Sequence, residues 1–572
     1  MLEPIPPTPS VWHTALRHRI TLGLGLALAL SMTAKAVTLT SVRSFDFADG
    51  ASDRFYAYTG QLAQGRDGNL YGTMPFGGSN NAGTAFKLTP GGTFTKLHDF
   101  DYATEGGNPY GGLTLGKDGN FYGTNTGGGI RGAGTVFKMT PAGAVTILHR
   151  FNVAVGEGFG PYAPPIQGRD GNFYGTTGYG GAIGFGKGDG TIYRITPSGT
   201  FTTLYTFAYD PVLGTHPQGS FPLAPLIQGA DGALYGTANT GGDVGESLHG
   251  TVFKVTTDGV VSTVYAFDYT HGSNPYGPVT QGTDGNLYGT TVYGGTFGSG
   301  TAFKLTLKGV ITVLYNFDNG SAAALAKGYY PYAGLVQGSD GSFYGATNSG
   351  GANGLGALFR ITPAGVYTVK ASFHGTDGSS PQSTPFLHTN GRIYGLTRAG
   401  GLVNAGTLYS LDVGAPGFIA PIPNAAKAGT PVGLLGAVGG TTGVSFNGVN
   451  ASFSGTGNTF RTTVVPAGAA TGLIKVTTPT GTPQTLKAFQ QLPTLTAFGP
   501  ASGAVGSAVI LTGSGLTQTT KVTFGGGAIA SFVVDSATQI TATVPVGAIT
   551  GKIAATTAGG RVSTATAFTV TP

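Results

Sequence analysis

The sequence contains no cysteine, few charges and a single tryptophan, and each shortage excludes a class of proteins. Without cysteine there is no disulfide framework, cysteine-ligated zinc, thiol nucleophile or lipidated N-terminal cysteine. The lone Trp12 lies near the N-terminus, which argues against WD-type repeats. Charged residues make up 9 % of the chain, against roughly 25 % in an average soluble protein. Lys and Arg form no cluster, so the formal net charge of +6 does not indicate nucleic-acid binding.

Apolar runs of membrane-spanning length are also missing. The 11-residue run at 20–30 follows a basic stretch at 17–19 and precedes Ala-Lys-Ala at 34–36. A membrane anchor needs about 20 apolar residues. We therefore expect residues 1–36 to be a signal peptide, cleaved after Ala36, and the product to be secreted or held at the cell surface or in the periplasm. The long Pro-rich stretch before residue 17 leaves the true start codon open.

Glycine is the abundant residue, at 103 of 572 positions. It disfavours long helices, because each helical Gly costs about 1 kcal/mol relative to Ala. Together with Thr, Val, Tyr and Phe it suits short strands joined by tight turns. With 40 % hydrophobic and 11 % aromatic residues the chain is too apolar for disorder. The composition predicts an all-β protein.

One unit recurs along residues 37–413. It opens with Asp-Gly-x-(Leu/Phe)-Tyr-Gly and continues with a Gly-Gly pair, a Gly-(Thr/Ala) strand and a strand that ends in Phe. The first residues of the motif, 50 to 61 residues apart, are Asp67, Asp118, Asp170, Asp231, Asp284, Asp340 and Asn390. Such a period should be sought before any other signal, because it marks repeat architectures.

Each unit offers four short strands with alternating apolar and polar residues. In the fifth unit these are 260–267, 277–281, 286–291 and 301–305. We expect Asp-Gly to form a two-residue hairpin turn in which both central residues have positive φ. Four strands per unit, with the Phe-ended strand occurring seven times, predict a seven-bladed β-propeller. An open β-solenoid is the alternative, but it would need polar caps that we do not find.

The wording of the repeat, DGNLYGT followed by GG and GTVFK, resembles the GloVer-type tandem repeats of exported proteins in environmental bacteria. Its Asp-Gly-Asn-Leu-Tyr stretch is also similar to NHL propeller repeats. The resemblance covers residues 37–413. It implies an exported β-propeller and carries no particular chemistry.

The repeat ends near residue 414, and tyrosine ends with it. Residues 493–572 resemble an IPT/TIG domain, an immunoglobulin-like sandwich, from the strand that begins at Pro493 to the closing Phe568-Thr-Val. Residues 416–491 resemble a divergent copy. The resemblance implies two sandwich domains that act as a spacer or an adhesive stalk.

The repeated aspartates could hold calcium or shape turns. A calcium loop needs further oxygen ligands at fixed offsets. Two residues after the motif's first residue stand Ala233 in the fourth copy and Arg392 in the seventh, and neither side chain is a calcium ligand. All seven copies keep Asp-Gly or Asn-Gly, so we interpret Asp67 and its equivalents as structural turns, with no metal site and no cofactor.

Catalytic signatures are absent from the sequence: no HExxH, GxSxG or Walker-type string occurs. His98 and His149 stand where other copies have Tyr, so we interpret them as strand residues. Paired carboxylates could serve a glycosidase or lyase, and Glu105, Glu157 and Glu246 are the loop candidates. These three glutamates lie in different units, so we predict no catalytic residue.

The loops after the Phe-ended strands vary most and carry aromatic, amide and imidazole groups, which suits a ligand face. The candidate binding residues are Tyr110, Tyr162, His216, His271, Tyr276, Tyr330 and Tyr332. We expect a monomeric binding or scaffold protein whose partner is an extracellular polysaccharide or a surface protein. A secreted carbohydrate-active enzyme with its site at the propeller mouth is the alternative.

Overall fold

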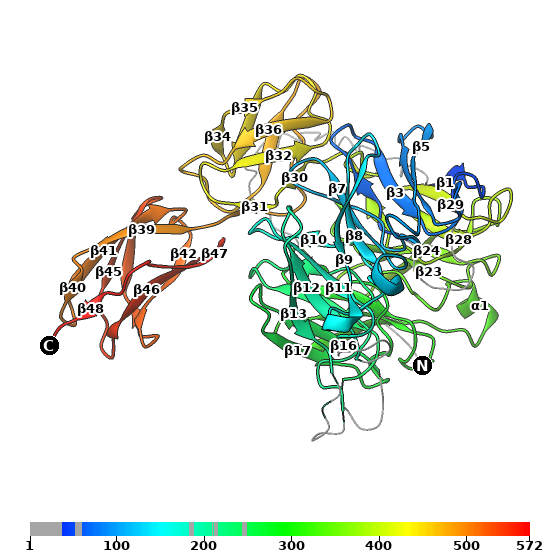
Figure 1. The fold of residues 1–572 in the computed structure, drawn as a ribbon. Coiled ribbons are helices and arrows are strands. Elements are labelled where there is room, and N and C mark those ends of the chain that lie inside the picture. The colour runs from blue at the N-terminus through cyan, green and yellow to red at the C-terminus, as the bar shows by residue number, and fades with distance from the viewer. Residues whose placement is uncertain (1–36, 52–59, 182–187, 209, 211–214, 243–248) are drawn as a thin grey trace, which may run out of the picture. The chain divides into compact units, whose positions relative to one another are not determined.

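The computed structural model describes residues 37–572 except 52–59, 182–187, 209, 211–214 and 243–248. Strands dominate the described chain (Figure 1), and its helices are the short α1 (Ala322–Leu325) and two 3₁₀ turns, Ile130–Gly132 and Val153–Val155. The all-β prediction is confirmed. The predicted signal peptide lies outside the described residues.

The first four sheets of the repeat region each take four consecutive strands in sequence order. The strands of the first two are β2 (Ala63–Gln64), β3 (Leu70–Met74), β4 (Thr84–Leu88), β5 (Phe94–Asp99), β6 (Thr114–Leu115), β7 (Phe121–Asn125), β8 (Thr135–Met139) and β9 (Val145–Arg150). Those of the next two are β10 (Ile166–Gln167), β11 (Phe173–Thr177), β12 (Thr191–Ile195), β13 (Phe201–Thr206), β14 (Ile227–Gln228), β15 (Leu234–Ala238), β16 (Thr251–Val255) and β17 (Val261–Ala266). All pairings are antiparallel, as the short connections require.

The fifth and sixth sheets repeat this order, and the seventh does not. The strands of the fifth and sixth sheets are β18 (Thr280–Gln281), β19 (Leu287–Thr291), β20 (Thr301–Leu305), β21 (Ile311–Asn316), β22 (Val336–Gln337), β23 (Phe343–Thr347), β24 (Ala357–Ile361) and β25 (Tyr367–Ser372). The last sheet contains β26 (Ser379–Pro381), β27 (Phe386–Leu387), β28 (Ile393–Ala399) and β29 (Thr407–Asp412) together with β1 (Thr38–Ser44). The N-terminal strand therefore completes the sheet of the last repeat.

Backbone and side-chain contacts give β1 the role that the Phe-ended strand has elsewhere. The Phe45 amide donates to the Gly406 carbonyl at 3.1 Å, as the Phe207 amide does to Gly190 at 2.9 Å. The Phe45 ring packs on Phe86 of the first sheet, with 5.5 Å between ring centroids. Four other Phe-ended strands make the same Phe–Phe contact with the next sheet along the chain, and Phe151 and Phe373 pack on Tyr193 and Tyr409 instead. The sheets thus form a closed ring, which is the predicted β-propeller.

Aromatic stacking explains why each repeat needs Tyr followed by Gly. Tyr71 stacks on Phe121 of the next sheet at 4.1 Å between centroids. Gly72 lies opposite Phe86 on the neighbouring strand, and a Cβ there would come within 2.6 Å of the ring. Tyr122 stacks on Phe173 and Tyr288 on Phe343 in the same way, whereas the other junctions place Leu or Ile beside the Tyr. In every repeat the Gly faces an aromatic ring of the neighbouring strand, and each junction between sheets has its own buried cluster. Tyr fills the junction, and Gly leaves space for the ring across the strand.

The Asp-Gly turn differs from the predicted two-residue hairpin. The Gly68 amide donates to the Gly65 carbonyl at 3.0 Å, and the Gly65 amide donates to Asn69 at 2.8 Å. Gly68 has φ +78°, whereas Asp67 is not among the residues with positive φ. The loop is therefore a three-residue type I turn with a glycine bulge. The two-residue prediction was wrong because it assigned positive φ to the aspartate as well.

Residues 420–491 form paired sheets around their own apolar core, which includes Val432, Leu434, Phe446 and Ile474. The strands are β30 (Ala420–Ile422), β31 (Ala425–Ala426), β32 (Pro431–Leu435), β33 (Gly443–Phe446), β34 (Val449–Ala451), β35 (Phe453–Ser454), β36 (Phe460–Val464), β37 (Ile474–Thr477) and β38 (Gln490–Gln491). The two main layers, β30-β32-β36-β35 and β34-β33-β37, are those of a small β-sandwich.

Residues 494–570 form a second sandwich, with Val509, Leu511, Val522, Ile540 and Phe568 in its core. Its strands are β39 (Thr494–Gly499), β40 (Ser502–Gly503), β41 (Ala508–Ser514), β42 (Thr519–Gly525), β43 (Ile529–Ala530), β44 (Phe532–Ser536), β45 (Gln539–Thr543), β46 (Ile549–Thr557), β47 (Gly560–Ser563) and β48 (Thr569–Val570). Sheets β39-β41-β45-β44 and β43-β42-β46-β47 face each other across this core. Among the described residues, no helix is long and apolar enough to cross a membrane.

Candidate ligand site on the propeller axis

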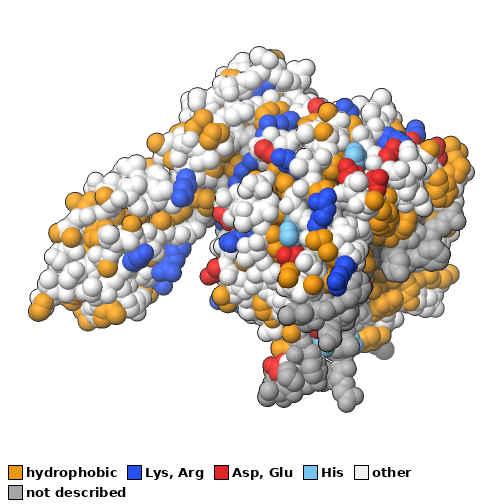
Figure 2. Space-filling view, in the orientation of Figure 1, with side chains coloured by type: hydrophobic (Ala, Val, Ile, Leu, Met, Phe, Trp, Pro, Cys, Tyr) orange, Lys and Arg blue, Asp and Glu red, His pale blue; other side chains and the backbone are white. Residues whose placement is uncertain are grey.

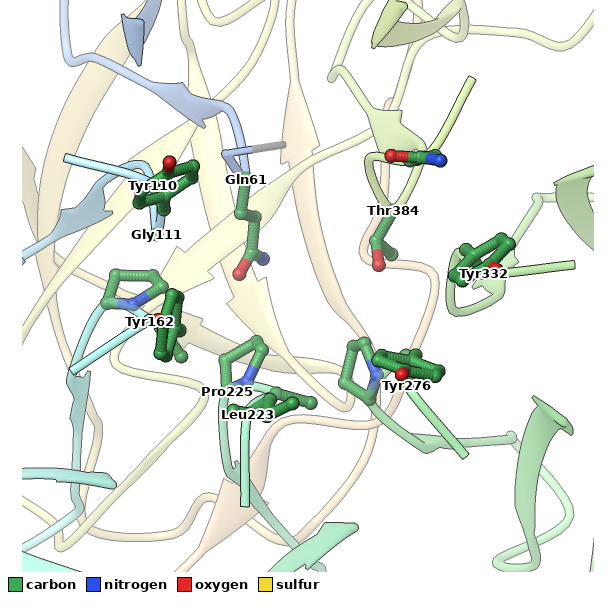
Figure 3. Close-up of a pocket in the computed structure, with 15 residues that line it drawn as sticks. Gln61, Tyr110, Gly111, Tyr162, Leu223, Pro225, Tyr276, Tyr332 and Thr384 are labelled. Atoms are coloured by element: carbon green, nitrogen blue, oxygen red, sulfur yellow. The ribbon is translucent and has the colours of Figure 1, made fainter. Parts of the chain in front are cut away.

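A small cavity lies where the seven repeats converge. Its volume is about 50 Å³, and every repeat contributes to its lining from the segment that precedes its two-residue strand (β2, β6, β10, β14, β18, β22 or β27). One lining residue from each repeat, in order, gives Gln61, Tyr110, Tyr162, Leu223, Tyr276, Tyr332 and Gln382. Figure 3 shows these segments arranged around the opening. We call the cavity and its fifteen lining residues the axial mouth.

Tyrosines dominate two sides of the axial mouth. Tyr110 and Tyr162 form one pair, with ring centroids 5.8 Å apart, and Tyr276 and Tyr332 form the other, at 5.3 Å. The two pairs lie on opposite sides of the opening in Figure 3. Further rings extend both pairs outward, with Tyr179 at 6.0 Å from Tyr162. Tyr162, Tyr276 and Tyr332 are partly exposed, whereas Tyr110 is 7 % exposed.

The remaining lining residues divide into a polar and an apolar edge. Gln61 and Thr384, from the first and seventh repeats, lie together on one side, and Leu223 and Pro225 of the fourth repeat lie on the other (Figure 3). Gln382, also from the seventh repeat, is only 6 % exposed. The first and seventh repeats are neighbours because the ring closes between them.

No lining residue carries a charge at neutral pH. The fifteen residues include no Asp, Glu, His, Lys or Arg. Burial raises the pKa of Tyr276, and burial together with the Tyr293 hydroxyl raises the pKa of Tyr332, so both phenols stay neutral. Charge is sparse on the molecule in general, as the scattered red and blue side chains of Figure 2 show. The axial mouth can therefore bind by stacking and neutral hydrogen bonds.

Four of the seven predicted binding residues line the axial mouth: Tyr110, Tyr162, Tyr276 and Tyr332. The other three, His216, His271 and Tyr330, do not. His216 pairs with Asp189 at 3.1 Å and His271 with Asp268 at 2.7 Å. Tyr330 packs edge-on against Tyr293 at 5.5 Å between centroids. These three residues contact other loops of the propeller and do not line the cavity.

Sequence reasoning missed Leu223 and Gln382, although a signal for both exists. Six mouth residues stand eight residues before the Asp or Asn that opens the turn, as Tyr110 does before Asp118 and Gln382 before Asn390. Applied to every copy, this register selects Leu223 and Gln382 as well as the four tyrosines. The sequence analysis selected tyrosines and histidines of the variable loops and therefore passed over both.

Carboxylates of the loops are paired with histidines in the outer strands. Glu105 lies 2.7 Å from His98, and Glu157 lies 2.8 Å from His149. Each glutamate is thus held by a histidine of its own repeat, and neither lines the axial mouth. Glu246 lies outside the described residues. Glu105 and Glu157 are thus held in separate ion pairs and are not brought together in the axial mouth.

The turn carboxylates are occupied by protein donors. In six repeats the Asp accepts from the backbone amide two residues on, at 3.1–3.3 Å, and from the Tyr hydroxyl four residues on, at 2.7–3.1 Å. In the seventh, Asn390 reverses the second bond and donates to the Tyr394 hydroxyl at 3.0 Å. Among the described residues, no three His, Cys, Asp or Glu cluster as a metal site would require.

Hydrogen bonding also fixes the charge state of the Asp284 carboxylate. Burial alone would raise the pKa of Asp284, but hydrogen bonds from Asn286, Lys304 and Tyr288 lower it well below its ordinary value. Lys304 lies 2.9 Å from the carboxylate. The turn is therefore held by an ionised aspartate.

A closed ring of mostly four-stranded sheets around a central axis defines a β-propeller. A model described as the Gloeobacter/Verrucomicrobia repeat matches residues 24–219 and 157–328, and the chain belongs to this family. A model of the IPT/TIG domain matches residues 493–570. The resemblance to GloVer-type repeats is thus confirmed up to residue 328, and the resemblance to an IPT/TIG domain is confirmed for residues 493–570. No curated protein matches the chain.

Solved structures resemble the chain at the level of general architecture. A fungal alcohol oxidase in complex with copper is 13 % identical, with 94 % of this chain and 99 % of that chain covered and a TM-score of 0.38. A structure assigned as a gluconolactonase is 12 % identical, with 67 % of this chain and 94 % of that chain covered and a TM-score of 0.34. A surface glycan-binding protein from Prevotella bryantii is 18 % identical, with 25 % of this chain and 38 % of that chain covered and a TM-score of 0.20. These TM-scores carry no functional argument. The repeat and the TIG domain together fit an extracellular binding or scaffold protein.

Proposed function

We propose that this protein is exported and binds a neutral saccharide at the axial mouth, with its two sandwich domains as a spacer. One observation carries the proposal: each repeat gives a residue to an uncharged cavity that has two tyrosine pairs at its sides. Ligand pockets typically combine aromatic walls with a few polar groups that fix orientation. The apolar face of a sugar ring stacks on an aromatic ring, and its hydroxyls match amide groups such as that of Gln61.

The same residues favour binding over hydrolysis. Glycoside hydrolysis uses two carboxyl groups, one on each side of the scissile bond. The fifteen residues of the axial mouth include no carboxylate and no histidine that could move a proton. We therefore expect the saccharide to leave unchanged.

Glycan-array binding of the full chain tests this function. We expect the wild-type protein to bind at least one neutral glycan, and Tyr110→Ala and Tyr276→Ala each to weaken binding at least about fivefold, because truncation of a buried aromatic anchor costs more than about 1 kcal/mol. Tyr102→Ala is the matched control, since Tyr102 is 43 % exposed and does not line the axial mouth. Absence of binding to every glycan, or an equal loss in the control, would contradict the proposal.

A further inference from the structure

The positive charge of the chain lies in its C-terminal third. Residues 37–413 hold 20 Lys and Arg against 22 Asp and Glu, whereas residues 414–572 hold seven Lys and Arg against one acidic residue, Asp535. The repeat region is therefore nearly neutral, with a slight negative excess, and the sandwich region is basic. Such an imbalance determines which charged partners each region attracts.

Three of the seven cations share one face of the last sandwich: Lys521 in β42, Lys552 in β46 and Arg561 in β47. The residues that follow them pack into or against the core, and these are Val522, Ile553 and Val562. Since successive residues of a strand point to opposite sides of the sheet, the three cations point outward. Lys521 pairs with Thr556, and Thr556 pairs with Arg561. Lys521 and Arg561 are thus two strands apart, with roughly 9–10 Å between their Cα atoms.

No carboxylate offsets these charges on that face. All three residues are exposed, and none of them forms an ion pair within the described part of the chain. Asp535 lies in β44 of the opposite sheet, where its carboxylate accepts from the Thr541 hydroxyl at 2.8 Å and the Gln539 amide at 3.2 Å. Figure 2 shows Lys and Arg side chains on the visible side of this sandwich. We call the outer surface of β42, β46 and β47 the basic face.

The residues of the basic face distinguish among polyanions. Phe524 is the only aromatic residue in β42, β43, β46 and β47, and it is buried in the core, so unpaired bases find no ring on which to stack. The major groove of duplex DNA admits a helix or a two-stranded ribbon, and this sheet has four strands.

Sugar chemistry matches the basic face better. Thr556 stands between Lys521 and Arg561 in the register, and Ser563 follows Arg561 on the same side of β47. Their hydroxyl groups can donate to and accept from sugar hydroxyls. The guanidinium group of Arg561 and the ammonium groups of the lysines suit carboxylates. A carboxylated polysaccharide presents both kinds of group along one chain.

We infer that the basic face binds a carboxylated polysaccharide, with Lys521, Lys552 and Arg561 as partners of its carboxylates. This inference does not rest on the axial mouth, because the site lies in the last sandwich and its ligand is charged. The last sandwich then attaches the protein to an acidic polymer in addition to serving as a spacer.

Affinity measurements of the full chain with polygalacturonate and alginate test this site. Fully methyl-esterified polygalacturonate is the matched neutral polymer. At about 50 mM salt, we expect at least one acidic polymer to bind about tenfold or more tightly than the methyl ester. An increase to about 200 mM salt should weaken that binding about tenfold, because three charge contacts release bound counterions.

Two triple variants locate the binding. The first removes the charges of the basic face: Lys521→Gln, Lys552→Gln and Arg561→Gln. The matched control removes three charges from the propeller: Arg131→Gln, Lys308→Gln and Lys370→Gln. We expect the basic-face variant to bind the acidic polymer about tenfold or more weakly, and the control to change the affinity by less than about twofold, since distant charges are screened by salt.

The outcomes separate this site from the proposed function. Equal affinity for the acidic and methyl-esterified polymers, or an affinity that survives in the basic-face variant, would overturn the inference. Tighter binding to vesicles of phosphatidylglycerol and phosphatidylcholine than to either acidic polymer would also overturn it and would assign the face to a membrane surface. Binding of neutral glycans on the array should be the same in the basic-face variant and the wild type. The wild-type comparison of acid with ester stands even where a variant fails to fold.

Discussion

The most direct test of the closed ring compares Phe45→Ala with Phe207→Ala. Phe207 ends a strand within its own repeat, whereas Phe45 ends the strand β1, which joins the sheet of the last repeat. Both rings are at most 1 % exposed, and both pack on a Phe of the next sheet, at 5.5 Å for Phe45 and 5.3 Å for Phe207. Truncation of a buried Phe to Ala costs about 3–5 kcal/mol. If β1 closes the ring, the two variants lose stability by similar amounts.

Native-state hydrogen exchange measures this loss where it occurs. Phe45→Ala should lower the opening free energy of the amides of β29, to which β1 pairs, by about 3 kcal/mol or more. Phe207→Ala should do the same for β12, the partner of β13. A loss below about 1 kcal/mol for Phe45→Ala beside a full loss for Phe207→Ala would refute the closure of the ring by β1.

Three further predictions concern the repeat and the N-terminus. Gly72→Ala should lower the free energy of unfolding, measured by thermal unfolding, by about 1–3 kcal/mol, because the added Cβ meets an aromatic ring. The control Gly91→Ala should change it by less than about 0.5 kcal/mol, because the only atom near its Cβ is 3.8 Å away. Because the pKa of Asp284 is lowered in the folded state, its ionised carboxylate stabilises the fold above the unfolded pKa of about 3.9, and this stability is lost as pH falls through the folded pKa. We therefore expect the Tm of the wild-type protein to decrease when the pH is lowered below about 4, and the Tm of Asp284→Asn to decrease less steeply. Edman sequencing of the exported protein should begin at Val37; an uncleaved N-terminus would contradict the signal peptide.

The local sequence pattern predicted most of the fold because the same pattern of strands and turns occurs in each of the seven repeats. The spacing of Asp67 and its equivalents, and the alternation within each unit, gave the sheets and their order. The turn type was harder to predict. The Asp67 side chain accepts from the backbone amide and the side chain of Asn69, at 3.2 and 2.7 Å, and this stabilises a longer loop with positive φ only at glycine. Side-chain bonds of this kind compete with the backbone rules used for hairpins.

The axial mouth could be predicted only in part, because its lining residues occupy equivalent positions in the repeats but differ in side-chain type. Tyr276 and Leu223 stand at the same register, and only the ring brings that register to the axis. Gln382 is held by a hydrogen bond to Asn348, which lies in the adjacent repeat. His216 and His271 were attractive by residue type, but nearby aspartates engage both. Contacts between repeats decide such cases, and sequence alone does not give them.

The pairing of β1 with β29 also sets the order in which the protein can assemble. The register joins Thr38 to Asp412, so the partner of the first strand is made only after the entire repeat region. Pairings over such long separations are slow, since the loop entropy must be overcome before the contact forms. Each of the first six sheets contains only its own repeat's strands and can form during synthesis, but the ring stays open until residue 412 is available. The growing chain is thus an open arc of finished sheets, and its seventh sheet is the last step of assembly.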